Sequence, residues 1–148
     1  MRTGKKLPML CLDLEGTLIS NAISQIPRPG LFSFLERVVQ ICDLSLYTSV
    51  SAERVDSIRR LLIAENAAPD WLLFLPVIRP EGSIKFKALA GRVDALLLDD
   101  QPSVLAPGEE SWWVPIKEFA PPYSDDDREL DVALALVESR LAFRGQPS

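Results

Sequence analysis

The most constraining feature of this chain is an apolar run that ends in two carboxylates, a glycine and a threonine. Residues 9–18 read Met-Leu-Cys-Leu-Asp-Leu-Glu-Gly-Thr-Leu. The apolar part is typical of a buried strand. Side chains two residues apart on an extended backbone point the same way, so Asp13 and Glu15 can face one ligand. Gly16 permits a sharp turn, whose freed amides can form an anion-binding concavity. Taken alone, the segment also fits a strand that ends in solvated acids.

Two further apolar runs end in polar residues that suit the same chemistry. The run at residues 44–47 is followed by Thr48 and Ser49. A third run, at residues 95–98, is followed by Asp99 and Asp100. In an open α/β sheet, ligands bind at the carboxyl ends of the parallel strands. We therefore expect the three strand ends to converge on one site.

A basic pair precedes the third run. Lys85 and Lys87 stand in a short helix-like segment that is closed by Gly91. A lysine ammonium can neutralise a phosphate as a point charge. The alternative for either lysine is a solvated position on the surface of a helix.

The chain contains no histidine and two cysteines, which narrows the possible chemistry. Without histidine, Ser-His triads and His-ligated zinc sites are excluded. Cys11 and Cys42 lie in apolar surroundings, where a buried and inert thiol is expected. Neither starts a cysteine-phosphatase signature, because Thr17 and Thr48 stand where that signature needs an arginine. Carboxylates with Mg²⁺ are the remaining natural set for handling phosphate.

Length and composition predict a single domain. The 148 residues suit one domain, and 47% of them are hydrophobic. We expect residues 1–8 and 142–148 to be flexible tails. The net charge of −5 argues against nucleic acid as a direct ligand, because binding to a phosphate backbone needs clustered Lys and Arg. No apolar stretch approaches the roughly 20 residues of a membrane span, and no signal-peptide pattern is present, so we expect a cytoplasmic protein.

Strand and helix patterns alternate along the chain, which predicts an α/β fold with a parallel sheet and helices on both faces. Short strands are expected at residues 71–75 and 112–116. One helix is expected to start at a Ser51 N-cap, and the last helix at a near capping box of Ser124 and Asp127. The side chains expected to face inward in three helices are Leu31, Phe34, Leu35 and Val38; Val55, Ile58, Leu61 and Leu62; and Leu130, Leu134, Val137 and Leu141.

A response-regulator receiver is the alternative fold, because it also places acids, a threonine and a lysine around magnesium. In a receiver the acid pair opens the domain and the lysine follows the last strand. Here Lys85 precedes Asp99 and Asp100, so the order does not fit.

The order of motifs resembles that of the haloacid dehalogenase-like (HAD) phosphohydrolases. Residues 13–17 are similar to their first motif, Thr48 to the second, Lys85 to the third and residues 99–100 to the fourth. Within that superfamily the chain is most similar, over roughly residues 9–141, to the RNA polymerase C-terminal-domain phosphatases and the NLI-interacting-factor group. The supporting residues are Arg28-Pro29-Gly30, Leu46-Tyr47-Thr48-Ser49, the spacing from Lys85 to Gly91-Arg92, and Val114-Pro115-Ile116.

The resemblance implies a role for each motif residue. Asp13 would attack phosphorus and form an aspartyl-phosphate. Glu15 would act as general acid and base, and its backbone carbonyl would reach Mg²⁺. Lys85 would neutralise the transferring group, while Asp99 and Asp100 would bind Mg²⁺ together with Asp13. The hydroxyl of catalytic Thr48 would hold a phosphate oxygen, and the phosphate-binding residues implied are Leu14, Gly16, Thr48, Ser49 and Lys85.

The implied function is Mg²⁺-dependent hydrolysis of a phosphate monoester by a HAD-like Rossmannoid domain. Residues 18–30 and 51–84 leave no room for a folded cap, so we expect a capless, open site that suits a phosphorylated protein. A small-metabolite phosphatase is the first alternative. A weak or non-catalytic binding module is the second, because the family has Asp where this chain has Glu15. The C-terminal-domain phosphatases also have Glu where this chain has Gly16.

Overall fold

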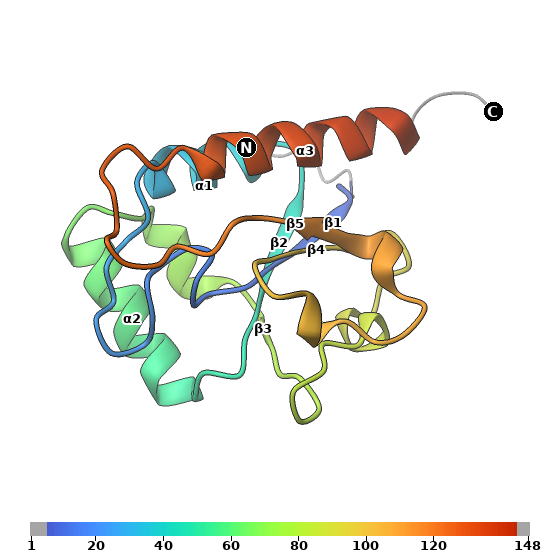
Figure 1. Cartoon of the computed structure of the whole chain (residues 1–148), viewed down its shortest axis with the longest axis horizontal. Coiled ribbons are helices and arrows are strands. Elements are labelled where there is room, and N and C mark those ends of the chain that lie inside the picture. The colour runs from blue at the N-terminus through green and yellow to red at the C-terminus, as the bar shows by residue number, and fades with distance from the viewer. Residues whose placement is uncertain (1–5, 145–148) are drawn as a thin grey trace.

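A parallel sheet of five strands forms the centre of the computed structural model, which describes residues 6–144 (Figure 1). The sheet has the order β3-β2-β1-β4-β5, and every neighbouring pair of strands is parallel. This arrangement confirms the predicted α/β class with a Rossmann-like parallel sheet. The strands are β1 (Met9–Leu12), β2 (Asp43–Tyr47), β3 (Val77–Ile78), β4 (Leu96–Asp99) and β5 (Trp113–Pro115).

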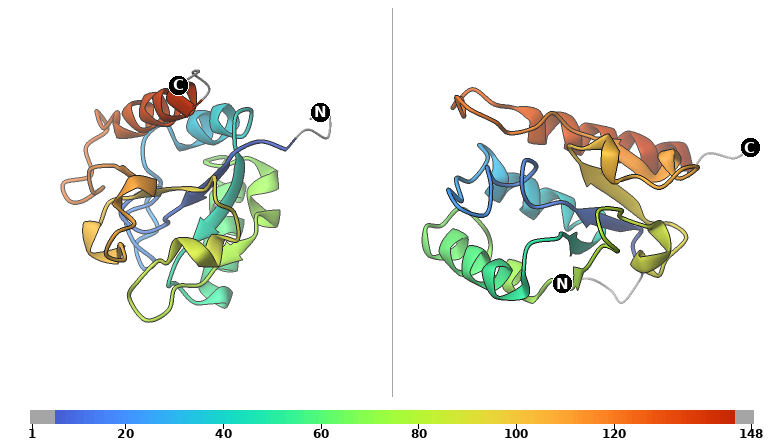
Figure 2. Two further views of the ribbon diagram at one scale, coloured as in Figure 1. Left: turned by 90° about the vertical axis from the view of Figure 1, so that its right-hand side faces the viewer. Right: turned by 60° about the horizontal axis from the view of Figure 1, so that its bottom comes forward.

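Helices cover the two faces of the sheet unequally. The three α-helices contribute to one large apolar core on one face, and α1 and α3 lie side by side (Figures 1 and 2). The opposite face is covered by short 3-10 helices and loops. The α-helices are α1 (Leu31–Val38), α2 (Ala52–Ala64) and α3 (Glu129–Arg144), and the 3-10 helices on the opposite face are η2 (Lys87–Ala90), η3 (Pro102–Val104) and η4 (Glu110–Trp112).

Alternate residues of the central strands face the two layers. Leu12 of β1 and Leu98 of β4 lie in the core beneath the α-helices. Cys11 and Leu97 lie in the second cluster, together with the buried Trp112. This period of two is the geometry of an extended strand, and burial on both faces explains why these strands are apolar throughout.

The first two α-helices follow the predicted pattern with one exception. All four residues of the predicted stripe in α1 are buried, and the Ser51 hydroxyl accepts a hydrogen bond from the Arg54 amide as an N-cap of α2. In α2, Leu62 is buried but Leu61 is 39% exposed. The prediction that Leu61 faces inward is wrong, because the buried positions of α2 define a stripe that Leu61 lies beside.

The strand predicted at residues 71–75 is a 3-10 helix. This helix, η1, spans Asp70–Phe74, and the strand that joins the sheet is β3, which starts after Pro76. The apolar run fits a helical turn because Leu72 is buried while Phe74 is 80% exposed. The β-branched pair Val77 and Ile78 supplies the actual strand.

The last helix begins later than its predicted capping box. α3 starts at Glu129, whose amide donates to Asp127 Oδ1 at 3.1 Å, while Ser124 accepts from the Asp126 amide in the preceding turn. Asp127 therefore takes the capping position that the sequence assigned to Ser124. The predicted inward residue Leu141 is partly buried against the core.

The ends of the described chain are bonded to the domain. The Asp43 amide donates to Pro8 O at 2.9 Å, and the Arg92 guanidinium donates to Leu7 O. α3 continues to Arg144, inside the segment predicted as a C-terminal tail. Residues 1–5 and 145–148 of the predicted tails lie outside the described residues. Within residues 6–144, no helix combines the length and the apolar character that crossing a membrane would need.

The strand order changes direction between β1 and β4. From β1 the chain proceeds to β2 and β3 on one side, and β4 then enters the sheet on the other side of β1. Such a switch point leaves a crevice at the carboxyl ends of the two central strands, where α/β proteins bind their ligands.

Candidate active site

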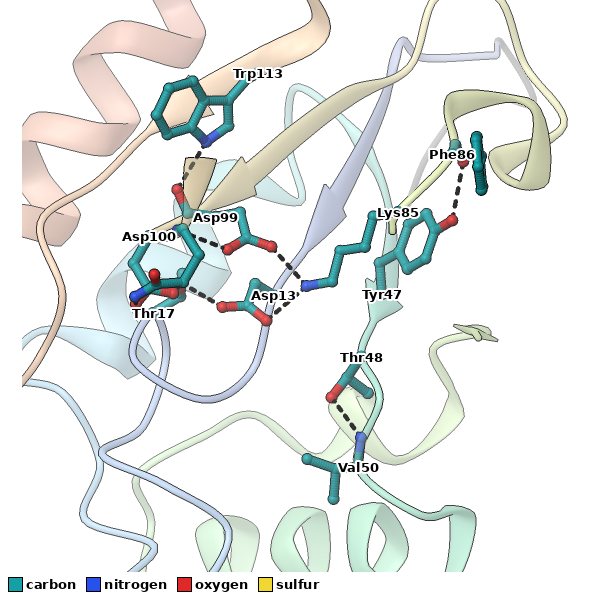
Figure 3. Close-up of polar contacts among 11 residues, drawn as sticks. Asp13, Thr17, Tyr47, Thr48, Val50, Lys85, Phe86, Asp99, Asp100 and Trp113 are labelled. Atoms are coloured by element: carbon teal, nitrogen blue, oxygen red, sulfur yellow. Dashed lines mark hydrogen bonds and ion pairs between the residues drawn. The ribbon is translucent and has the colours of Figure 1, made fainter. Parts of the chain in front are cut away.

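Asp13 lies at this switch point, directly after β1. Its amide donates to Leu98 O of the neighbouring strand at 3.0 Å, which fixes the backbone of the residue beside the end of β4. The side chain is buried and accepts two hydrogen bonds, from Lys85 Nζ at 2.7 Å and from Thr17 Oγ1 at 2.9 Å (Figure 3). Asp13 is therefore held in one orientation at the crevice.

Lys85 bridges the acids of the two central strands. Its Nζ lies 2.7 Å from Asp13 Oδ1 and 2.5 Å from Asp99 Oδ2. The residue is 4% exposed, and its ammonium lies 5.8 Å from the centre of the Tyr47 ring. Its own amide donates to Val104 O at 2.8 Å, which anchors the segment before η2. The lysine thus reaches the site from the segment between the Glu81–Ile84 bridge and η2, not from a helix-like one as predicted.

The two acids at the end of β4 are each oriented by Gln101. The Gln101 amide donates to Asp99 Oδ1 at 3.0 Å, and its side-chain Nε2 donates to Asp100 Oδ2 at 2.9 Å. Trp113 Nε1 donates to the carbonyl of Asp99 at 2.9 Å, which links β5 to the same corner. Figure 3 shows Asp13, Lys85 and Asp99 pointing toward one another from different elements.

The site holds more negative than positive charge. Burial raises the pKa of Asp13 well above its usual range, and the ammonium of Lys85 partly opposes this. Burial likewise raises the pKa of Asp99 against the same ammonium. Burial lowers the pKa of Lys85, but its two carboxylate neighbours outweigh burial and the net effect is a raised pKa. One lysine does not offset three clustered acids, which is the condition that favours binding of a cation.

A metal ion fits this donor set. Asp13, Asp99 and Asp100 each offer one carboxylate oxygen, and these oxygens all lie within 4.8 Å of one another. An all-oxygen set of carboxylates suits a hard divalent cation such as Mg²⁺. Glu15 is not a member of this cluster of side chains, and the expectation that its backbone carbonyl reaches Mg²⁺ stays a prediction.

The Glu15 side chain lies outside that cluster, although it lines the same cavity. It is exposed, and its Oε2 accepts a hydrogen bond from the Ala22 amide at 2.7 Å. The next residue, Gly16, has φ +77° and donates its amide to Ile19 O at 2.8 Å. Within residues 6–144 the amides of Leu14 and Glu15 have no hydrogen-bond acceptor. Among the described residues, the amides of Leu14 and Glu15 are therefore unpaired donors, whereas the Gly16 amide is already used; the expectation that Leu14 binds phosphate stays a prediction.

The residues after β2 form the far side of the site. Thr48 is buried, and its hydroxyl accepts from the Val50 amide at 3.1 Å, so its own proton remains available for donation. Ser49 lines the cavity described below. Lys87, the alternative to Lys85, is separate from the site: its amide donates to Glu109, and both residues line another depression.

A cavity of about 520 Å³ opens over these groups. The four predicted acids, Lys85 and Ser49 all line it, so most of the predicted site is brought together there. Residues of two loops, together with Gly16, Gln101, Val104 and Glu118, complete its wall. The loop residues are Ser20 and Asn21 on one side and Pro80, Gly82 and Ser83 on the other.

The sequence interpretation did not assign a role to two residues of this site. Thr17, fully buried, contacts both Asp13 and Asp100, at 2.9 and 3.2 Å. Its spacing of four residues from Asp13 was a visible signal, because the turn at Gly16 returns the chain toward the acid. Gln101 was visible only as the residue that follows the acid pair.

A family model described as NLI interacting factor-like phosphatase matches residues 8–146. The match covers nearly the whole chain and includes every motif residue of the site, which confirms the resemblance inferred from the motifs. No curated protein matches the chain.

Proposed function

Because the chain belongs to the NLI interacting factor-like phosphatase family, we propose that it hydrolyses a phosphate monoester with Mg²⁺ through an aspartyl-phosphate on Asp13. The observation that carries the proposal is the buried Asp13 carboxylate, which is held by Lys85 and Thr17 beside Asp99 and Asp100. Phosphoryl transfer needs an oriented nucleophile and neutralised charge. Both are supplied by these five side chains.

In the first step, an Asp13 carboxylate oxygen attacks phosphorus and the bond to the leaving oxygen breaks. Lys85 stays beside the reacting carboxylate and offsets negative charge on the transferring group. The proton of Thr48 and the amide of Leu14 are the donors proposed for phosphate oxygens. Mg²⁺, held by Asp13, Asp99 and Asp100, would supply further charge neutralisation when bound.

In the second step, water attacks phosphorus of the aspartyl-phosphate and the Asp13 carboxylate is released. Glu15 is the proposed acid for the leaving oxygen and the proposed base for this water. The carboxylate lines the cavity, which is the position such a group needs. Inorganic phosphate and the alcohol are the products.

A phosphorylated protein is the proposed substrate. Within residues 6–144, the cavity is bordered by the end of β4, by η3, by loops and by the short bridge between Glu81 and Ile84, and none of these forms a folded cap. An enzyme without a cap depends on the substrate itself to exclude water from the reaction. A broad protein surface does this better than a small metabolite.

The chemistry is tested with an aryl phosphate in the presence of Mg²⁺ or a chelator. Hydrolysis is expected to require Mg²⁺ and to vanish in Asp13→Asn, and the intact protein is expected to carry a trapped acyl-phosphate. Asp70→Asn is the matched control, because Asp70 is an exposed acid in η1 outside the cavity. Activity that persists in chelator or in Asp13→Asn would exclude the mechanism.

The substrate class is tested by comparing phosphopeptides with a panel of phosphometabolites. We expect a higher kcat/KM on some phosphoserine or phosphothreonine peptide than on any common metabolite. One strongly preferred sugar or nucleotide phosphate would favour the small-molecule alternative. Inactivity on both sets, with Mg²⁺ still bound, would favour the binding module.

A further inference from the structure

Arg28 is a fully buried cation that lies outside the cavity, and the mechanism above gives it no role. The residue is 1% exposed and lies in the loop that precedes α1. Asp127, at the start of α3, accepts from Nε at 2.9 Å and from Nη2 at 3.1 Å. This two-point contact fixes the plane of the guanidinium as well as its charge.

The other hydrogen bonds of the guanidinium go to backbone carbonyls. Nη1 donates to Gly16 O at 3.3 Å and to Thr17 O at 3.2 Å, and Nη2 donates to Lys117 O at 2.7 Å. The group also lies 5.4 Å from the centre of the Phe119 ring. Arg28 therefore joins the turn after Asp13 to the segment that leads into α3.

The turn that Arg28 contacts is the one that carries the Thr17 hydroxyl. That hydroxyl lies between the acids of two strands, 2.9 Å from Asp13 Oδ2 and 3.2 Å from Asp100 Oδ1. The Gly16 carbonyl additionally accepts from the Phe119 amide at 2.8 Å. The backbone carbonyls of this turn are thus bound by Arg28 and Phe119. The Thr17 hydroxyl of the same turn contacts the proposed nucleophile, Asp13, and the metal-binding acid Asp100.

We propose that Arg28 is a positioning residue for the phosphatase site. Together with Asp127 it fixes the carbonyls of Gly16 and Thr17. This keeps the Thr17 hydroxyl at the place where it contacts both Asp13 and Asp100. Arg28 touches none of the site acids itself. The proposal rests on the proposed function for its kinetic consequence, but its consequence for metal binding does not depend on turnover.

The geometry requires an arginine. Three nitrogens in one plane reach two oxygens of Asp127 and three carbonyls, two in the turn after Asp13 and one at Lys117. A lysine would keep the positive charge but has a single nitrogen, which cannot serve all these acceptors. Arg28→Lys therefore releases the turn while it preserves charge.

Arg59→Lys is the matched control. Arg59 also donates to two backbone carbonyls, Leu72 O at 3.2 Å and Leu75 O at 2.9 Å, but it joins α2 to η1 and does not contact the turn after Asp13. Both substitutions are expected to lower the melting temperature. A purely structural arginine would do no more than that.

In folded protein, Arg28→Lys is expected to reduce kcat by about 10- to 100-fold with a small change in KM, because misplaced groups slow the chemical step. The midpoint of a Mg²⁺ titration, followed by the melting temperature, is expected to rise in Arg28→Lys and to stay unchanged in Arg59→Lys. Wild-type kcat and Mg²⁺ affinity in Arg28→Lys would overturn the proposal.

Asp127→Asn is the second variant, for the case that Arg28→Lys does not fold. It removes the charge partner but leaves the guanidinium and its carbonyl acceptors in place, and a smaller fall in kcat and in Mg²⁺ affinity is expected. Wild-type values in this variant would also overturn the proposal. If the wild type binds Mg²⁺ but hydrolyses none of the substrates, the proposed function fails while the Mg²⁺ titration still tests Arg28.

Discussion

Replacing Gly16 by alanine tests how closely the turn after Asp13 fits the metal-binding acids. Gly16 has φ +77°, and a Cβ at this position would lie 2.5 Å from Asp100 Oδ2 and 2.9 Å from its Cγ. The Asp100 carboxylate cannot swing freely aside, because Gln101 Nε2 and the Thr17 hydroxyl both contact it. The substitution therefore changes both the backbone energy and the place of one acid.

The two effects differ in size and in what they alter. A left-handed backbone costs a residue other than glycine about 1–2 kcal/mol, which for a domain of this size lowers the melting temperature by about 2–8 °C. Ordinary contact with the new methyl group begins near 3.4 Å, so the carboxylate must retreat by about 1 Å. A displacement of that size in a catalytic site can cost on the order of 10²-fold in rate.

Gly108→Ala separates the two effects. Gly108 has φ +85° and no atom within 4 Å of the added Cβ, so it carries the backbone cost alone. We expect both variants to melt earlier, but only Gly16→Ala to lose kcat/KM and to need more Mg²⁺ for half-maximal activity. Equal activity and equal Mg²⁺ requirement in the two variants would refute the reasoning.

Two further predictions concern Glu15 and the buried thiols. Glu15→Gln keeps an oxygen that can accept from the Ala22 amide but removes the acid. Turnover should therefore fall while the melting temperature stays constant. An unchanged rate would show that Glu15 is not the general acid. Burial raises the pKa of Cys11 and of Cys42 from 9.0 to about 12, so the unfolded thiols lose their protons first. The free energy of unfolding should be constant below pH 9 and then fall by about 1.4 kcal/mol per pH unit and thiol up to about pH 12. Denaturant titrations between roughly pH 8 and 10 measure this fall in the free energy of unfolding. Cys42→Ala should remove the contribution of one thiol to the slope, and a free energy that does not change with pH would contradict the prediction.

The central strands were predictable because their sequence pattern has one physical cause. Burial on both faces makes β1, β2 and β4 mostly apolar, and polar residues stand where each strand leaves the sheet. The rule that ligands bind at these carboxyl ends then placed Asp13, Asp99 and Thr48 on the same side of the sheet. The choice of Lys85 over Lys87 needed the family resemblance, since both lysines stand in the same short segment.

The errors lie where local pattern and tertiary packing disagree. Residues 71–75 are apolar enough for a strand, yet they turn in η1 because the sheet edge is reached only after Pro76. The contact between Arg28 and Asp127 joins positions 99 residues apart, and neither residue carries a local signal for the other. A single sequence therefore indicated most of the candidate site residues but not the contacts that hold them.

The direction of the Glu15 side chain follows from where β1 ends. The rule that side chains two residues apart share a face holds on an extended strand, but β1 stops at Leu12, and Glu15 forms a bridge with Ile19 after the turn has begun. One carboxylate oxygen, Oε2, is consequently bound to the Ala22 amide at 2.7 Å. The other oxygen, Oε1, has no hydrogen-bond partner within residues 6–144 and belongs to a side chain that lines the cavity. An acid role for Glu15 therefore does not require the Ala22 contact to break, because Oε1 alone can exchange a proton with the leaving oxygen.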